Sequence, residues 1–465
     1  MLCLHQAEEV SAMNIEIFNM RNPWRTGRPY EHSWLPRREL ETLAGWMDNP
    51  YVVVITGARQ AGKTTLLSML VQRLLANGVP AADIFYFSMD DPGAAELISN
   101  PGDLLRFLRD ANSGPRAYIL IDEVQRLPSP GLALKILYDL GTGIKLVVSG
   151  SSSLEIRSTT REHLVGRSRE LILYPLSFSD IVRQNIPAAS RNDGDFAAFH
   201  RLYGQSLVPL FVDFAVWGGY PAVVTAPSAA ERAEQLRQIY DTYVTRDVSQ
   251  FLHVGRPDVY NRLVRTLALQ VGSQMTWEGL ANEVRSSSET VRHYVAMLQG
   301  TYVCELATPF SSNKLTGLRK TPKAYFVDCG MRNSTVPSLA ALDSRTDRGH
   351  VVEQVVFQEL LKVLPATDEL HYWRTKGTTD EVDFVVTRGD RILPIEVKDT
   401  HFSEPSLPGG LARLVDETHP RYAVVVTRDF VAQRTVGTTA VHFVPEGTFL
   451  ARRDMLLQLL DDALG

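Results

Sequence analysis

A phosphate-binding loop between an apolar strand and a helix constrains the fold of this chain more than any other feature. The motif G-x-x-x-x-G-K-T spans residues 57–64, and a second threonine follows it. Its positions are Gly57, Ala58, Arg59, Gln60, Ala61, Gly62, Lys63, Thr64 and Thr65. Residues 51–56 form an apolar run, and residues 66–75 have helical spacing. This setting distinguishes a nucleotide site from a Gly-rich turn that matches by chance.

The residue types of the motif indicate what it binds. Its glycines let backbone N–H groups surround phosphate oxygens, and the helix that follows adds the positive end of its dipole. We expect Lys63 to reach the β- and γ-phosphates and the Thr64 hydroxyl to hold Mg²⁺. The predicted ligands are therefore a nucleoside triphosphate, ATP or GTP, and Mg²⁺.

Length and composition bound the rest of the chain. At 465 residues it exceeds one ordinary core, so we expect two or three domains. Its 44% apolar and 22% charged residues are typical of a globular protein, and its net charge of −5 excludes a polybasic one. Any contact with nucleic acid must then come from a local basic patch.

Neither the cysteines nor the apolar stretches indicate an exported or membrane protein. Cys3, Cys304 and Cys329 lie far apart, which favours a reducing compartment and argues against disulfides and structural zinc. The longest apolar stretch, 207–224, is interrupted by proline, aspartate and two glycines, so it predicts a core rather than a membrane span. The N-terminus has no signal-peptide pattern. We expect a cytoplasmic protein without membrane contact.

Apolar strands alternate with helices around the phosphate loop. We expect strands at 51–56, 84–87, 117–121, 145–148 and 171–174. This alternation predicts an α/β fold, a parallel sheet with helices on both faces, as in P-loop NTPases. Changes of pattern then divide the chain into an N-terminal arm at 1–34, an ATPase domain at 35–227, a helical and winged-helix-like domain at 228–340, and a C-terminal α/β domain at 341–465.

Candidate hydrolytic residues follow the later strands of the ATPase domain. Hydrolysis needs one carboxylate to hold Mg²⁺ and another to polarise the attacking water, and we expect Asp122 and Glu123 in these roles. The polar turn 149–151 could sense the γ-phosphate, although an ordinary Ser/Gly turn is an equal alternative. Arg167 is a candidate to stabilise transition-state charge at a neighbour's nucleotide, in competition with Arg169 and with a solvated surface role. Whether the chain forms a homo-oligomer stays open.

The segment 276–298 predicts two short helices that resemble a winged helix-turn-helix. Its second helix would present Ser287, Glu289, Thr290, Arg292 and His293 outward. The basic segment 314–323, with Lys314, Arg319, Lys320 and Lys323, would follow as a wing that contacts phosphates. We therefore expect DNA as a partner, with dimerisation or a lid module as the alternative role.

The C-terminal part brings together residue types that suit metal-dependent hydrolysis. Asp383 opens one strand, Glu396 and Lys398 close the next, and 388–390 predict a hairpin turn between them. Glu396 and Lys398 share a face because strand residues alternate, and the pairing places Asp383 beside them. This set can bind Mg²⁺ and hydrolyse a phosphodiester, with Glu353 of the preceding helix as a further ligand.

The spacing matches the PD-(D/E)XK nuclease pattern, which predicts a restriction-endonuclease-like C-terminal domain. The alternative is solvated charge at strand ends, because short matches of this kind occur by chance. Two details count against it: the charges lie within apolar strands, where an unpaired carboxylate is costly, and a helix with its own acidic residue precedes them.

The order of the motifs resembles the prokaryotic AAA-type ATPases that carry a C-terminal nuclease-like domain of unknown function. The similar segments are 35–37, 57–65, 120–125, 149–153, 164–167, 174–178, 218–221, 246–247, 322–328 and 381–383. The resemblance implies an ATPase core, a winged-helix-like middle and a nuclease-fold tail, and it favours Arg167 over Arg169. It implies no reaction. Ala58 stands where a proline is common, which should not harm phosphate binding.

These features support two hypotheses of different classes. In the first, nucleotide state controls DNA engagement and a metal-dependent C-terminal nuclease site. In the second, the chain is a nucleotide-switched regulatory or scaffolding protein whose nuclease fold is catalytically silent. A protein-remodelling motor is a third class, but no pore-loop motif supports it.

Overall fold

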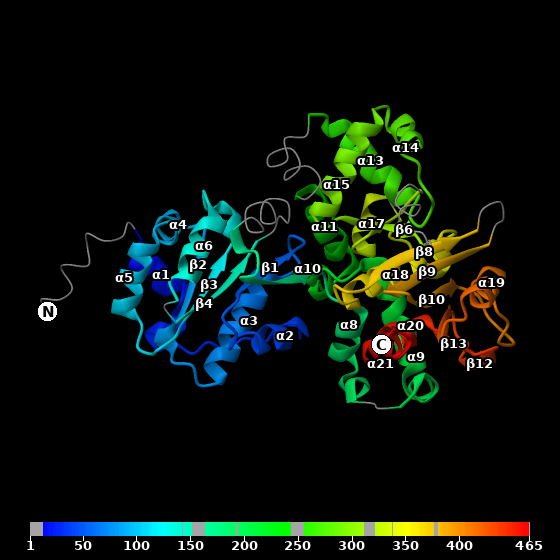
Figure 1. Cartoon of the computed structure of the whole chain (residues 1–465), viewed down its shortest axis with the longest axis horizontal. Coiled ribbons are helices and arrows are strands. Elements are labelled where there is room, and N and C mark those ends of the chain that lie inside the picture. Colours follow the sequence, from blue (N-terminus) through cyan, green and yellow to red (C-terminus); the bar gives the residue numbers. More distant parts are fainter. Residues whose placement is uncertain are drawn as a thin grey trace, which may run out of the picture. The chain divides into compact units, whose positions relative to one another are not determined.

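Two sheets organise the chain. The computed structural model describes residues 13–141, 143–150, 163–191, 194–242, 255–310, 321–336, 338–375 and 380–464. It divides into two compact units, Met1–Tyr174 and Pro175–Gly465, each drawn in Figure 1. The expected domain borders stay a prediction, although the border between the compact units falls earlier than residue 227. The segments 151–153, 246–247 and 314–320 lie outside the described residues.

The first unit contains a five-stranded sheet with the order β2-β3-β4-β1-β5, and every pair in it is parallel. Its strands are β1 (Val52–Gly57), β2 (Ile84–Ser88), β3 (Ala117–Asp122), β4 (Ile144–Ser149) and β5 (Ser168–Leu173). The structure confirms the five strands and the parallel sheet that the apolar runs predict. β1 is buried along its whole length, as a strand covered on both faces must be.

Helices cover both faces of this sheet (Figure 1). They are α1 (Ile15–Arg21), α2 (Glu39–Gly45), α3 (Lys63–Ala76), α4 (Pro92–Ser99), α5 (Pro101–Ala111) and α6 (Pro130–Asp139), with 3₁₀ turns η1 (Pro23–Thr26), η2 (Ala81–Asp83) and η3 (Val124–Arg126). Phe85, Ile119 and Leu146 of the strands pack with residues of α1, α4, α5 and α6 in one buried cluster. On the other face, α3 contacts β1 and β3.

The described part of the N-terminal arm covers the exposed edge of β2. The Asn22 side chain donates to the Tyr86 carbonyl oxygen at 3.0 Å and accepts from the Tyr86 N–H at 2.7 Å. The Trp24 indole N–H donates to the Ile84 carbonyl oxygen at 3.1 Å. These side chains occupy hydrogen-bonding groups that a neighbouring strand would otherwise take, so the arm protects the sheet edge.

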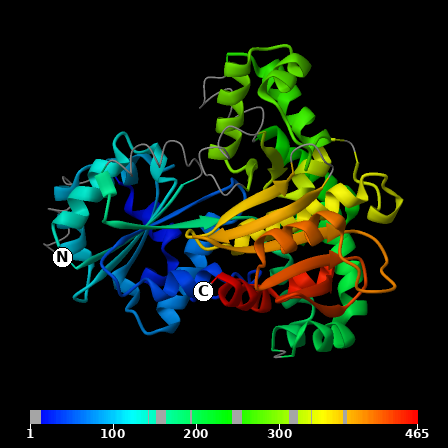
Figure 2. The same cartoon turned by 45° about the vertical axis from the view of Figure 1, so that its right-hand side comes forward.

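The second unit is built on a mixed eight-stranded sheet with the order β12-β13-β11-β10-β9-β8-β6-β7, seen in yellow to orange in Figure 2. Its strands are β6 (Cys304–Pro309), β7 (Lys323–Phe326), β8 (Glu369–Arg374), β9 (Glu381–Arg388), β10 (Arg391–Lys398), β11 (Tyr422–Thr427), β12 (Ala432–Val436) and β13 (Thr439–Pro445). β9 and β10 form the predicted antiparallel hairpin, whereas β10, β11 and β13 run parallel.

The second unit also contains helices along most of its length. They are α8 (Phe178–Asn185), α9 (Phe196–Trp217), α10 (Pro221–Thr225), α11 (Ala229–Tyr240), α13 (Pro257–Leu269), α14 (Trp277–Val284), α15 (Ser288–Gly300), α17 (Cys329–Thr335), α18 (Arg348–Val363), α19 (Gly409–Thr418), α20 (Glu446–Ala451) and α21 (Arg453–Leu464), with 3₁₀ turns η4 (Pro187–Arg191) and η6 (Leu342–Ser344). Within the described ranges, none of the helices has the length and apolarity needed to cross a bilayer.

Three of the motif segments, 174–178, 218–221 and 322–328, meet where α9 ends. The Gly219 N–H donates to the buried carboxylate of Asp328 at 2.7 Å, and the Leu176 N–H donates to the Gly219 carbonyl oxygen at 2.8 Å. A Cβ at Gly219 would lie 2.0 Å from the Leu176 carbonyl oxygen. Close packing therefore requires a glycine at position 219. Asp328 is buried at this contact, and its burial raises its pKa.

The Asn22 contacts to β2 give a testable expectation for the edge of the first sheet. Replacing Asn22 with alanine leaves the Tyr86 N–H and carbonyl without their partners, at a cost of about 2 to 3 kcal/mol. Hydrogen exchange in peptides that cover Ile84–Ser88 should then accelerate by roughly 30-fold or more. Met20→Ala, at a residue 75% exposed on the same helix, is the control and should leave the exchange unchanged.

Candidate functional site

The phosphate loop is held open by glycines that no other residue could replace. β1 ends at Gly57 and α3 begins at Lys63. Gly57 has φ +140°, and a Cβ there would lie 2.1 Å from the Leu173 carbonyl oxygen of β5. Gly62, the residue before α3, has φ +99°. Both glycines adopt conformations that L side chains avoid, so the loop keeps its backbone N–H groups available for phosphates.

Lys63 lies inside the loop. Its ammonium donates to the carbonyl oxygens of Gly57 at 2.9 Å and Ala58 at 2.8 Å. Burial lowers the pKa of Lys63 to about 8, against the opposing effect of Glu123 and Asp122. The side chain is thus positioned where a phosphate would meet it, and an anionic ligand would restore its ordinary pKa.

The Asp122 carboxylate accepts hydrogen bonds from three hydroxyl groups. Thr64 Oγ1 donates at 2.6 Å and the Tyr86 hydroxyl at 3.0 Å to one oxygen, and Ser149 Oγ donates to the other. The structure therefore brings together Thr64 and Asp122, the predicted Mg²⁺ residues, and it places the candidate sensor Ser149 against Asp122. Tyr86 was missed by sequence reasoning, since a tyrosine in an aromatic strand looks like core.

Glu123 follows Asp122 in an uncommon backbone conformation. Its φ is +56°, in the left-handed region, and Gln125 donates a side-chain hydrogen bond to its carboxylate. Such a conformation costs about 1 to 3 kcal/mol for a residue with a side chain and is found mostly at functional sites. Glu123 therefore lies in a turn directly after β3, and its role beside the attacking water stays a prediction.

Arg37 connects the loop to the neighbouring strand. Its guanidinium donates to the Tyr174 carbonyl oxygen at 2.9 Å, just beyond β5, and to the Ala61 carbonyl oxygen within the phosphate loop. The side chain is buried, with 8% of the residue exposed. Sequence reasoning noted residues 35–37 only as part of a resemblance, and nothing local indicates that the arginine reaches the loop.

Arg167 lies just before β5, at the end of the strands opposite to the phosphate loop. Val52 pairs with Ser168, whereas Gly57 pairs with Leu173, so Arg167, six residues before Leu173, is about 20 Å from the loop end of the strand. Its Nε lies 2.9 Å from Asp139 Oδ1. It cannot reach the nucleotide of its own chain from there. Its role at a neighbour's nucleotide stays a prediction.

In the second unit, the hairpin brings together two of the three predicted carboxylates. The β9–β10 register pairs Ile395 with Phe384, so the next pair is Glu396 with Asp383. The Asp383 N–H donates to Glu396 at 3.3 Å, and the Val397 N–H donates to Asp383 at 2.8 Å. Lys398 Nζ lies 2.6 Å from the Glu396 carboxylate. Burial raises the pKa of Asp383 well above its usual range, and Glu353 and Glu396 add to the effect.

Glu353 of α18 is bound to two β7 side chains that the sequence did not assign to this site. The Tyr325 hydroxyl donates to its carboxylate at 2.6 Å, and Lys323 Nζ lies 3.3 Å away. Lys323 also forms an ion pair with Glu381 and is only 2% exposed. Among the described residues, no three carboxylate, imidazole or thiolate side chains converge as a metal site. Glu353 is close enough to raise the pKa of both Asp383 and Glu396, and Lys323 lies beside it. Whether Asp383, Glu396 and Glu353 hold a metal ion together stays a prediction.

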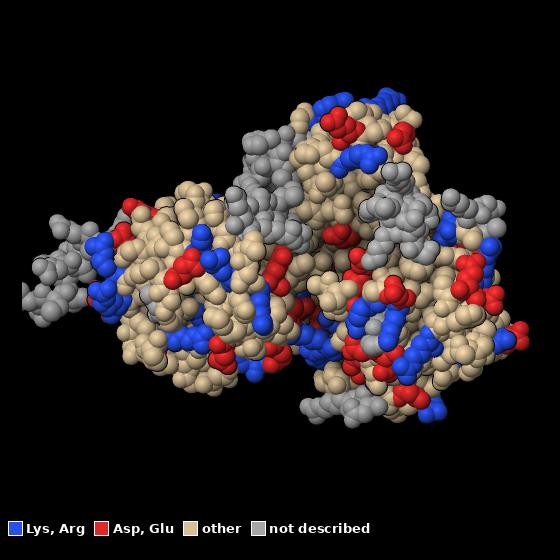
Figure 3. All heavy atoms as spheres, viewed as in Figure 1, with Lys and Arg blue, Asp and Glu red and all other residues tan. Residues whose placement is uncertain are grey.

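The helix-turn-helix region contains the two short helices that the sequence predicts. Arg285, which has φ +55°, ends α14, and Ser287 caps α15. Glu289, Arg292 and His293 are exposed as predicted. The prediction that Lys323 contacts DNA phosphates is wrong, because this lysine is buried and its ammonium forms ion pairs with Glu353 and Glu381. On the face in Figure 3, basic and acidic side chains are interspersed over both units.

The fold and the nucleotide site define an AAA-type P-loop ATPase. Residues 49–182 match the AAA domain family, which contains the loop, Asp122 and Glu123. Residues 208–343 and 348–444 match two domains of unknown function, DUF8612 and DUF4143. The chain thus hydrolyses ATP through its first unit.

The chain belongs to the same family as the uncharacterized protein Rv2008c of Mycobacterium tuberculosis, to which it is 30% identical over 379 residues, covering 80% of this chain and 76% of that protein. An uncharacterized protein of Haemophilus influenzae is 24% identical over 366 residues, covering 77% of this chain and 85% of that one. Among solved structures, the ADP form of the Aeropyrum pernix ORC2 protein is 13% identical and covers 60% of this chain and 90% of that chain, with a TM-score of 0.33.

The lowered pKa of Lys63 predicts proton uptake on nucleotide binding. At pH 8.5 a lysine with a pKa of about 8 is mostly neutral, and anionic phosphates restore its charge, so binding should take up about 0.7 proton. Calorimetry of ATP binding in buffers of different ionisation enthalpy measures this number. Affinity should fall as the pH rises through this window. Equal heats in all buffers at pH 8.5 would contradict the assignment, and at pH 6.5 Lys63 should contribute no uptake.

The Tyr86 hydrogen bond to Asp122 predicts a selective loss of turnover. Tyr86→Phe removes one donor to a carboxylate, worth about 1.5 to 3 kcal/mol, so kcat for ATP hydrolysis should fall by roughly tenfold or more. ATP affinity should stay within about twofold, because the loop contacts remain. Tyr118→Phe, on β3, is the matched control. An unchanged kcat in Tyr86→Phe would show that the phenol does not orient Asp122.

Proposed function

We propose that this ATPase uses its nucleotide state to control DNA engagement and phosphodiester cleavage at a metal-dependent site in its second unit. The observation that supports it best is the β9–β10 register, in which Asp383, Glu396 and Lys398 lie together on one hairpin. The order α18-β8-β9-β10-α19-β11 around them agrees with a restriction-endonuclease-like core.

Within the first unit, the proposed roles follow the contacts. Thr64 and Asp122 are oxygen ligands already in contact, which suits Mg²⁺. When bound, Mg²⁺ neutralises charge on the β- and γ-phosphate oxygens. Lys63 would leave the loop carbonyls for the phosphates, and Glu123 would polarise the attacking water. Tyr86 and Ser149 would keep Asp122 in place as the ion binds.

In the second unit, Asp383 and Glu396 are the residues that would hold a divalent ion. Two coupled carboxylates in a buried site repel each other, and a cation relieves that repulsion. When bound, the ion supplies a Lewis acid at the phosphodiester. Lys398 would orient the attacking water, with its ammonium fixed by Glu396. Lys323 and Tyr325 both contact Oε1 of Glu353, so Glu353 would join the ion through Oε2.

DNA engagement by residues 228–340 is supported by the exposed face of α15. Arg292 and His293 point to solvent there, and Arg292 stacks on the Trp277 ring at 4.6 Å. A helix that presents basic side chains after a short turn is the usual reader of a DNA groove. Glu289 on the same face limits the contact to few phosphates.

A specific observation favours the second hypothesis, a nucleotide-switched regulator with a silent nuclease fold. Lys323 occupies the acidic site as an internal cation between Glu353 and Glu381. The neighbouring acids raise its pKa in spite of burial, so it stays charged. In this hypothesis the lysine fulfils the electrostatic role of a metal ion, and the second unit acts as a docking surface.

Cleavage of DNA distinguishes the two hypotheses. The full chain should cut supercoiled plasmid or branched DNA with ATP and Mg²⁺ or Mn²⁺. Lys398→Ala should lower that rate by roughly 100-fold, because it removes a charge that acts at the reacting group, and should leave ATP hydrolysis unchanged. Arg391→Ala, on the exposed start of the same strand, is the control.

Calorimetry with Mn²⁺ separates the remaining outcomes. Heat that disappears in Asp383→Ala supports a metal site. No heat in the wild type, together with heat in Lys323→Gln, supports the silent fold with its internal cation. If neither the wild type nor Lys398→Ala cuts any substrate under broad conditions, the nuclease proposal fails.

A further inference from the structure

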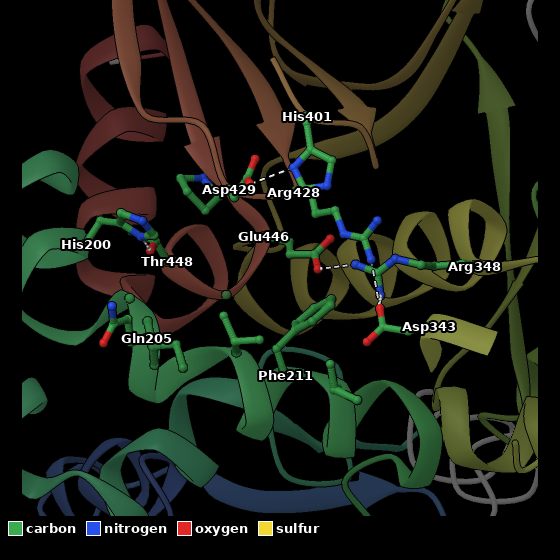
Figure 4. Close-up of a pocket in the computed structure, with 16 residues that line it drawn as sticks. His200, Gln205, Phe211, Asp343, Arg348, His401, Arg428, Asp429, Glu446 and Thr448 are labelled. Atoms are coloured by element: carbon green, nitrogen blue, oxygen red, sulfur yellow. Dashed lines mark hydrogen bonds and ion pairs between the residues drawn. The ribbon is translucent and has the colours of Figure 1, made fainter. Parts of the chain in front are cut away.

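A second cavity in the second unit is separate from the carboxylate site. It has a volume of about 350 Å³ and lies where the parallel strands β10, β11 and β13 end. Ligands of α/β proteins commonly bind at the carboxyl ends of parallel strands. Its polar side comes from the start of α18 and the ends of the strands, and its apolar side comes from α9 (Figure 4).

The polar side contains more carboxylates than guanidinium groups. Arg348 Nη2 lies 2.8 Å from Glu446, its Nε 2.9 Å from Asp399 and its Nη1 3.4 Å from Asp343. Arg428 Nη2 lies 2.8 Å from the same Asp343 carboxylate. Two cations thus face three acids in one connected network. His401 and the nearby Asp429 form their own pair at 2.6 Å, so they do not relieve the imbalance.

Glu446 is the acid in this network whose charge is least compensated. It is 6% exposed; one carboxylate oxygen accepts from Arg348, and the other, Oε2, has no hydrogen-bond partner among the described residues. Burial raises the pKa of Glu446 to about 8, Arg348 opposes the rise, and Asp399 adds to it. A buried carboxyl oxygen without a partner is costly, which makes it a candidate contact for a bound molecule.

The apolar side is a helix surface that the fold leaves partly open. Leu207, Val208 and Phe211 of α9 line the cavity, and Val208 is 59% exposed. In Figure 4 the Glu446 carboxyl group lies between the arginines and Phe211. A molecule in the cavity would therefore meet a hydrogen-bond acceptor and an apolar surface together.

We propose that this cavity binds a small amphipathic organic cation, with an ammonium or amidinium head on Glu446 Oε2 and an apolar body against α9. The head group adds the positive charge that the network lacks and satisfies the free oxygen. An anionic ligand would add to the excess of carboxylates. The volume is at the lower end for small-molecule sites, which excludes a large ligand. The proposal does not depend on the nuclease assignment.

Titration of the full chain with three ligands of the same shape tests the proposal. The probes are 2-phenylethylamine, the neutral 2-phenylethanol and the anionic 3-phenylpropionate, measured by calorimetry at pH 9, where a Glu446 carboxyl with a pKa of about 8 is ionised and the amine is still charged. The amine should bind at least about tenfold more tightly than either analogue. In Glu446→Gln the amine and the alcohol should bind equally within about twofold, because the charge is lost. Glu404→Gln, at an exposed residue, should keep the preference.

A variant on the apolar side tests the second half of the site independently of Glu446. Val208→Ser, at an exposed position that does not threaten the fold, should weaken the amine by about threefold. Three results would each overturn the proposal: no amine binding up to about 10 mM, equal affinity of the wild type for the amine and the carboxylate, or an undiminished preference in folded Glu446→Gln.

Discussion

The parallel alignment of β2, β3 and β4 is the constraint on which the nucleotide site depends. Because their carboxyl ends meet at one edge, the Asp122 carboxylate of β3 lies within reach of Tyr86 on β2 and Ser149 on β4. The loop after β1 adds Thr64 from the same edge. Four elements therefore fix one carboxylate. Arg37 secures the loop to the end of β5, so the phosphate site has little freedom to relax without disturbing the sheet.

Acidic groups in the second unit differ in how far nearby cations balance their charge. Asp347 accepts from both Arg332 and Arg345, and its pKa is lowered by these partners despite burial. Two guanidinium groups thus compensate one carboxylate, and such a group stabilises the fold only when every partner is present. Asp383 and Glu446 behave in the opposite way: burial raises their pKa, and neighbouring acids exceed the local cations. Such unbalanced acids are typical of sites that expect a ligand.

Local patterns in the sequence predict the strands and the motifs, whereas residues that act through long-range contacts leave no local pattern. The strands, the phosphate loop and Asp122 follow from apolar runs and one motif, and the β9–β10 hairpin follows from its turn and its alternation. Arg37, Tyr86 and Lys323 act 24, 36 and 30 residues or more away in sequence. The spacing of apolar residues within a helix or strand does not indicate which distant residues a side chain will contact. The Glu446 cavity was missed for the same reason, since α9, α18 and three strand ends form it.

The eight-stranded sheet joins the middle and C-terminal parts of the chain, which we expected to be separate domains. We expected a helical domain to end at residue 340, yet β6 and β7 of that region belong to the same sheet as β8, β9 and β10. α15 contacts β6, β6 pairs with β8, and β8 pairs with β9, which begins beside Asp383. The helix-turn-helix region is thus joined to the acidic site by a continuous hydrogen-bonded sheet. Lys323 on β7 adds a further link between this sheet and α18, because its ammonium lies between Glu353 of α18 and Glu381 of β9.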